Sequence, residues 1–107
     1  MATMWFDGQV ANPGAGAVIA DTGQLSHNLG TVGISVVGNA DVAATLVVEY
    51  RDSTNTTTLH KQEISLLASA PFTFGPFTAV FADNERLRVT NKNLIALGNV
   101  GASIFIG

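Results

Sequence analysis

The amino-acid sequence predicts an all-β protein, a single-domain antiparallel β-sandwich of roughly seven or eight short strands. Two observations lead to this prediction. Short runs of alternating apolar and polar residues are separated by turn-forming residues, at the roughly 8–12-residue spacing that is typical of sandwiches and small barrels. In addition, no stretch of about ten residues or more carries a convincing helical period.

The clearest element is a predicted hairpin over residues 42–66. Its first strand is rich in β-branched residues, which favour strands, and residues 52–55 (DSTN) provide the turn, because Asp and Asn bond their own backbone. Neither face of the return strand, residues 56–65, is cleanly apolar. We therefore expect one of its faces to be exposed to water or to a partner.

The other strands are expected on both sides of this hairpin. In residues 85–91, Leu87 and Val89 should point inward while Arg86, Arg88 and Thr90 point to solvent. The last strand ends the chain, so the C-terminus should be held inside a sheet. The remaining strands are predicted at residues 17–20, 24–29, 31–37 and 94–106.

Two flanking segments are the candidates for contact with a partner. Residues 1–16 are predicted to form an extended N-terminal arm ahead of a sandwich domain at 17–107, and its aromatic pair should pack on the body or on a neighbour. Residues 71–81 concentrate phenylalanines, and their two prolines confine any strand there to an edge, a start or a bulge. We expect a loop that crosses the sandwich, or else an apolar rim against another chain. The candidate interface residues are Trp5, Phe6, Val10, Pro13, Phe72, Phe74 and Phe77.

Charge is scarce in this chain. Charged residues make up 12% of the 107 residues while hydrophobic residues make up 47%, a combination that excludes disorder. The cores of protein interfaces are depleted in charge, so the composition favours a homo-oligomer or an assembly component; the alternative is a monomer with a Thr/Asn-rich surface. With only five Lys and Arg residues, nucleic acid is not an expected partner.

No group of residues in the sequence indicates a catalytic or metal-binding site. The chain has no cysteine and only two histidines, His27 and His60, so we predict no metal site, no cofactor, no catalytic residues and no enzymatic activity. His27 is expected in or beside the core and His60 on the surface of the hairpin. The first residues lack a signal-peptide pattern, and the apolar runs fall far short of the roughly 20 residues of a membrane helix, so a soluble protein without membrane contact is expected.

Three stretches give the chain its resemblance to a known class: EYRDSTNTTTLHKQEI, FTAVFADNERLRVTNKN and NVGASIFIG. In these the chain resembles the capsid decoration (cement) proteins of tailed bacteriophages. The resemblance implies a jelly-roll-like sandwich, often a homotrimer, that is made in the host cytoplasm and binds the outside of the capsid in the virion. There it would clamp neighbouring major capsid proteins. No functional residues carry over, because such proteins share no fixed motif.

Two other functions stay open. A carbohydrate-binding module would use Trp5 or Tyr50 as a stacking platform beside Asn and Asp side chains. Another virion part, such as a head-fibre base or a tail component, would have the same composition.

Overall fold

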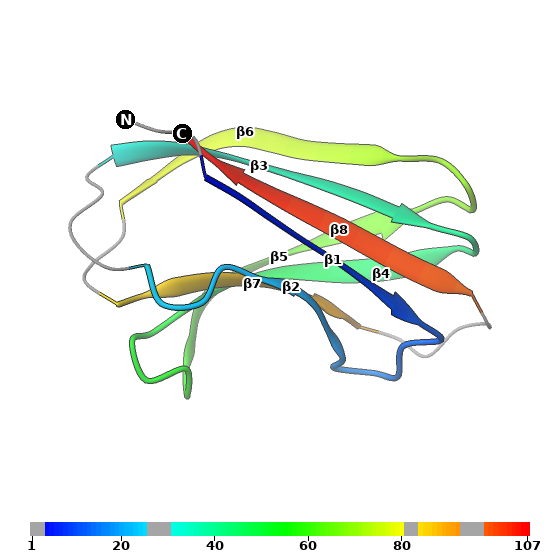
Figure 1. The fold of residues 1–107 in the computed structure, drawn as a ribbon, viewed down its shortest axis with the longest axis horizontal. Coiled ribbons are helices and arrows are strands. Elements are labelled where there is room, and N and C mark those ends of the chain that lie inside the picture. Colours follow the sequence, from blue (N-terminus) through cyan, green and yellow to red (C-terminus); the bar gives the residue numbers. More distant parts are fainter. Residues whose placement is uncertain (1–3, 26–30, 81–83, 93–97) are drawn as a thin grey trace.

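The computed structural model describes residues 4–25, 31–80, 84–92 and 98–107, and in these it contains eight β-strands and no helix. The strands form two four-stranded layers that face each other (Figure 1). Their bounds are β1 Met4–Ala11, β2 Val18–Asp21, β3 Thr31–Ala40, β4 Ala44–Arg51, β5 Thr58–Leu66, β6 Phe72–Val80, β7 Arg86–Asn91 and β8 Asn99–Ile106.

The strand order defines a jelly roll. Sheet A has the order β1-β8-β3-β6 and sheet B has the order β2-β7-β4-β5, and all pairings are antiparallel. The pairs β1 with β8, β2 with β7, β3 with β6 and β4 with β5 are nested, as if one long hairpin were wrapped into two sheets. This wrapping produces the two Greek keys of a jelly roll. The predicted all-β sandwich of seven or eight strands is therefore confirmed.

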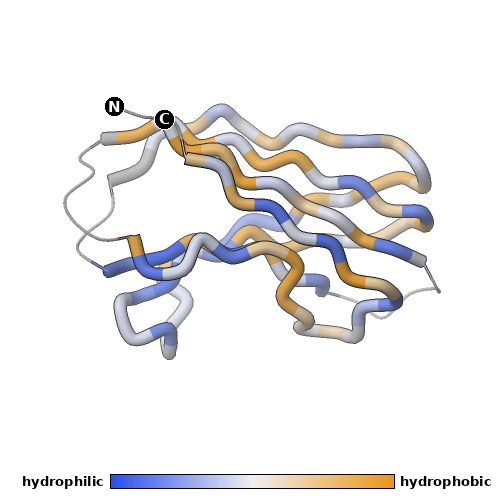
Figure 2. The backbone as a smooth tube through the Cα atoms, in the orientation of Figure 1, coloured by the Kyte–Doolittle hydropathy of each residue, from blue (hydrophilic) through white to orange (hydrophobic). Residues whose placement is uncertain are grey.

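The core lies between the two sheets and is built from alternate residues of each strand. Ile34, Leu46, Val89, Ile104 and Ile106 have no more than a trace of exposure. The hydropathy of the chain alternates along several strands accordingly (Figure 2). The Cα radius of gyration is 13.3 Å, close to the value of about 13 Å expected for one domain of 100 residues.

The predicted hairpin corresponds to β4 and β5, which pair over almost their full length. Leu46 and Val48 point into the core, and His60 is exposed on the hairpin, as expected for His60. The turn is held by its own side chains: Arg51 donates from Nε to Oδ1 of Asn55 at 2.9 Å and from its terminal nitrogen to the Asn55 carbonyl at 2.7 Å.

The N-terminal segment is an integral part of sheet A. Residues 4–11, predicted to belong to an extended arm, are extended as β1 and pair with β8 from Met4↔Ile106 to Ala11↔Asn99. The loop that follows is fixed by Asn91, whose amide donates to the carbonyls of Pro13 and Gly14 at 3.3 and 3.1 Å. Most of the predicted arm therefore packs on its own domain.

Two expectations need correction. Residues 72–80 form strand β6 instead of a crossing loop; β6 is the edge of sheet A, which agrees with the constraint from Pro76, and its register with β3 shifts between Ile34 and Val36. Thr90 is buried rather than exposed, because it pairs with Val18 of β2. The predicted strands at 24–29 and 94–98 lie largely outside the described residues, as does His27.

Candidate functional site

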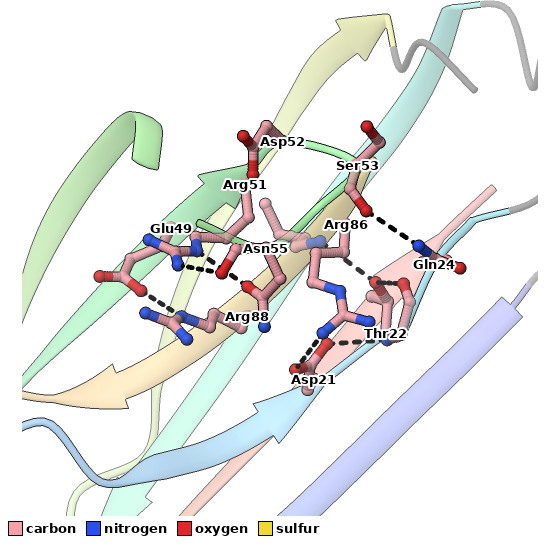
Figure 3. Close-up of polar contacts among 12 residues, drawn as sticks. Asp21, Thr22, Gln24, Glu49, Arg51, Asp52, Ser53, Asn55, Arg86 and Arg88 are labelled. Atoms are coloured by element: carbon pink, nitrogen blue, oxygen red, sulfur yellow. Dashed lines mark hydrogen bonds and ion pairs between the residues drawn. The ribbon is translucent and has the colours of Figure 1, made fainter. Parts of the chain in front are cut away.

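The outer faces of the two sheets differ in charge. On sheet B, cationic and anionic side chains pair with each other: Arg88 with Glu49, Arg86 with Asp21 at 3.5 Å, and Lys92 with Glu63 at 2.8 Å. The first two pairs lie side by side across β2, β7 and β4 (Figure 3). This face therefore satisfies most of its charges internally.

The β4–β5 turn at the end of sheet B carries a perturbed carboxylate. Asp52 accepts hydrogen bonds from the backbone N–H groups of Thr57 and Thr56 at 3.1 and 2.8 Å, and from the hydroxyls of Thr54 and Thr56. These bonds favour the ionised form, led by the one from Thr57, and lower the pKa of Asp52 to about 2. The role of Asp52 is to order the turn.

The outer face of sheet A, by contrast, has no basic residue. All five Lys and Arg residues lie on sheet B or directly after β7. The burial pattern of β1 places Trp5, Asp7 and Gln9 on this outer face, and that of β8 places Asn99, Gly101, Ser103 and Phe105 there. From β3, the less buried positions Ser35, Val37 and Asn39 complete the face.

One end of this face is an aromatic platform. Trp5 and Phe105 are direct partners in the β1–β8 register, and their rings stack with centroids 5.5 Å apart and an interplanar angle of 26°. Trp5 is nevertheless 65% exposed. The Trp5 ring is thus supported by the neighbouring Phe105 ring and is otherwise open to solvent. We call this pair the aromatic platform.

Beyond the platform, the same face is hollowed. A depression of about 380 Å³ is lined by glycines and short polar side chains of β1, β3 and β8. Gly101 lies at its centre, opposite Gln9 on one side and Asn39 on the other. The residues that line this polar hollow are Asp7, Gly8, Gln9, Val37, Gly38, Asn39, Ala40, Asp41, Asn99, Gly101, Ala102 and Ser103.

Several hydrogen-bonding groups of the hollow are available to a ligand. Within the described part of the chain, no hydrogen bond is formed by the side chains of Asp7, Gln9 or Asn39, and all three residues are exposed. Asp41 is engaged, since its carboxylate accepts from the backbone N–H of Asn99 at 3.1 Å. The hollow therefore offers both donors and acceptors but no cation.

A second depression opens between the two sheets, at the side where the edge strands β5 and β6 lie. It measures about 420 Å³ and is mainly apolar. Phe74 and Phe77, with ring centroids 5.2 Å apart, form part of its wall together with Tyr50. The Tyr50 hydroxyl is already bonded to the Glu85 carboxylate, so Tyr50 is not an open stacking platform.

The seven predicted interface residues do not form one surface. Phe6 and Val10 pack against the core from β1, and Pro13 is buried in the loop after β1. Phe72 is 46% exposed at the start of β6. Only Phe74 and Phe77 lie together, at the inter-sheet depression, while Trp5 lies on the outer face of sheet A.

The sequence reasoning did not identify the partners of Trp5. The predicted site residues do not include Phe105, Asp7, Gln9, Asn39 or Gly101. The alternation in MWFDGQVA indicates that Trp5, Asp7 and Gln9 share a face. It does not show that β8 lies beside them.

Neither a metal site nor a membrane helix is found among the described residues. No group of three or more His, Asp or Glu side chains in residues 4–25, 31–80, 84–92 and 98–107 is placed to hold a metal ion. Within the same ranges, no helix has the length and hydropathy to cross a membrane.

Comparison with known proteins identifies no family. No family model matches the chain, and no curated protein matches it. Among solved structures, one described as "CBM4 structure and function" aligns over 94% of this chain and 89% of its own length, at 12% identity and a TM-score of 0.41. A likeness at this level carries no functional assignment.

Proposed function

We propose that the protein is a carbohydrate-binding β-sandwich module whose site is the outer face of sheet A. The observation that carries this proposal is the aromatic platform: Trp5 is 65% exposed yet stacked on Phe105, in line with a polar hollow. A pyranose ring has an apolar face of C–H groups that packs on an aromatic ring. Its hydroxyls need the donors and acceptors that the hollow provides.

The electrostatics of the face narrow the class of sugar. Sheet A contributes the carboxylate of Asp7 and no basic side chain, so a sulfated or uronic-acid polymer would be repelled. A neutral polysaccharide would meet Gln9 and Asn39 as paired donors and acceptors, with Asp7 as an acceptor. The proposed ligand is therefore a neutral glycan chain running from Trp5 along β1 and β8.

The test is a titration with soluble neutral polysaccharides, read from the fluorescence of Trp5, the only tryptophan. A bound sugar should quench or shift the emission, and Trp5→Ala should abolish retention in polysaccharide-containing native gels. Leu67→Ala is the matched control, since Leu67 is 74% exposed but lies outside sheet A. Leu67→Ala should migrate like the wild type. The proposal fails if Trp5→Ala does so too with every neutral polymer tried.

A second proposal follows from the resemblance and the same face. The outer face of sheet A is nearly uncharged and carries the exposed Trp5. Such a face also suits a capsid decoration protein, because charged residues are depleted in the cores of protein interfaces. In this role the protein would form a homotrimer on a phage capsid and clamp major capsid proteins. Co-sedimentation with mature capsids that lack the protein tests it, and no binding at any capsid concentration would exclude this role.

A further inference from the structure

The edge strand β5 presents a long row of backbone groups with no partner strand, and this row is regular from His60 to Leu66. In the described part of the chain, β5 pairs with β4 on one side only. Five successive residues, 59–63, are exposed. An unpaired edge of this kind is a template for another strand.

The other edges are less suited to pairing. β6 contains Pro76, which has no N–H to donate, and its register is irregular. β2 has only four residues and a register shift of its own. β1 lies against β2 through Gly8, so close that an added Cβ atom would meet the Ile19 carbonyl oxygen at 2.0 Å. β5 has a register shift too, at Leu59, but from His60 to Leu66 its pairing with β4 is regular. This segment is therefore the open edge with both length and regularity.

The charges on β5 complement each other across a two-fold axis. When two antiparallel copies pair with Gln62 opposite Gln62, Lys61 of each copy lies opposite Glu63 of the other. These residues are directly opposed neighbours on one face of the sheet, a position where opposite charges stabilise a pair. In its own chain, Glu63 contacts Lys92 through Oε1 alone, and its side chain is 47% exposed. Its second oxygen is open to the partner's lysine.

We propose that the protein forms a two-fold symmetric dimer through antiparallel β5–β5 pairing centred on Gln62. The partner is a second copy of this chain, because the same sequence supplies both halves of each ion pair and the interface is isologous. Sheet B then continues across the dimer as eight strands.

The symmetry of this dimer bears on ligand binding. A two-fold axis between antiparallel strands is perpendicular to the sheet, so both copies present the outer face of sheet A on the same side. Two aromatic platforms would then face the same polymer, and attachment would gain from avidity. This consequence rests on the proposed carbohydrate-binding function; the dimer itself does not.

The test uses two charge reversals that are complementary to each other. In Lys61→Glu, two acidic residues oppose across the axis, and in Glu63→Lys, two basic residues do. Each variant alone should dimerise about tenfold more weakly or worse, since two facing pairs turn from attractive to repulsive. An equimolar mixture of the two variants restores opposite charges at both positions and should form a heterodimer.

Sedimentation velocity of the 107-residue chain from micromolar to near-millimolar concentration measures its dimerisation. The expected wild type is a species of about twice 11.1 kDa, and circular dichroism checks that each variant is folded. A wild type that stays monomeric or forms trimers overturns the proposal, as does a mixture that dimerises no better than its components. Binding of a short neutral oligosaccharide per chain should be equal in wild type and Lys61→Glu. Retention on an insoluble neutral polysaccharide should be weaker for Lys61→Glu than for the wild type. This comparison separates failure of the dimer from failure of the sugar site.

Discussion

Trp5 and Phe105 are directly opposed residues of β1 and β8, and the Phe105 ring supports an indole that is otherwise open to solvent. One hundred positions separate the two residues in the sequence, and only the wrapping of the jelly roll makes β1 and β8 neighbours. The pair therefore joins the two ends of the chain. It has consequences both for stability and for the geometry of the proposed site.

Removing Phe105 should loosen the platform while leaving the fold intact. Stacked aromatic pairs contribute about 0.5–1.5 kcal/mol beyond their burial. A double-mutant cycle of Trp5→Ala, Phe105→Ala and the double variant, followed by urea denaturation, should give a coupling free energy in this range. Phe105→Ala should also weaken sugar binding, because Phe105 positions the Trp5 ring from the neighbouring strand. Strictly additive effects would show that the indole is not positioned by Phe105.

Substitution by alanine should lower the stability of the fold at Gly8 but not at Gly101. A Cβ atom at Gly8 would lie 2.0 Å from the Ile19 carbonyl oxygen, so Gly8→Ala should push β1 away from β2 and cost about 1–3 kcal/mol or more. At Gly101 the nearest atom is 3.6 Å away, so Gly101→Ala should fold normally. Gly101→Leu should fill the polar hollow and reduce polysaccharide retention without lowering the melting temperature. A loss of stability in Gly101→Ala would contradict this account.

The strands were the part of the fold that the sequence could predict. In β7 the apolar and polar residues alternate along the sequence, and Leu87 and Val89 point inward as expected. Strand β6 was harder, because Pro76 is typical of loops and is tolerated in a strand only at an edge. Whether a segment is at an edge depends on the sheet order, which is not a local property.

The candidate site was predictable only in part. The sequence indicated Trp5 as a possible stacking residue, and the alternation of β1 puts Asp7 and Gln9 on the same face. Gly101, Asn39 and Phe105 enter the site through the pairings of β8 with β1 and β3. Registers between strands so distant in sequence depend on the fold as a whole, and no single-chain pattern encodes them.

Asp52 should stabilise the fold in a pH-dependent way. Hydrogen bonds in the folded turn, first among them the one from the Thr57 backbone N–H, lower the pKa of Asp52 from its ordinary value of 3.8 to about 2. A lowered pKa contributes stability that is fully present above the unfolded value and is lost as the pH falls toward 2. Asp52→Asn should therefore melt below the wild type at pH 7, and the two melting temperatures should converge between about pH 4 and pH 2.

The control is Asp7→Asn, because the Asp7 side chain accepts no hydrogen bond from another described residue. This variant should melt at the wild-type temperature at pH 7. A difference for Asp52→Asn that stays constant down to pH 2 would contradict the proposed role of the ionised turn.

Deleting residues 1–12 should unfold the domain, whereas removal of a separable arm would leave it folded. The deletion removes all of β1, and with it Phe6 and Val10, which pack against the core. It also leaves β8 with an unpaired edge on one side, since β8 pairs with β1 there and with β3 on the other side. Loss of two apolar side chains of this size costs several kcal/mol, which is comparable with the roughly 5–15 kcal/mol by which whole domains are stable. Circular dichroism and thermal melting should show a strongly destabilised or unfolded chain. A cooperative melt of this deletion variant near the wild-type temperature would instead establish residues 1–12 as a separable arm that is free to reach a neighbouring subunit.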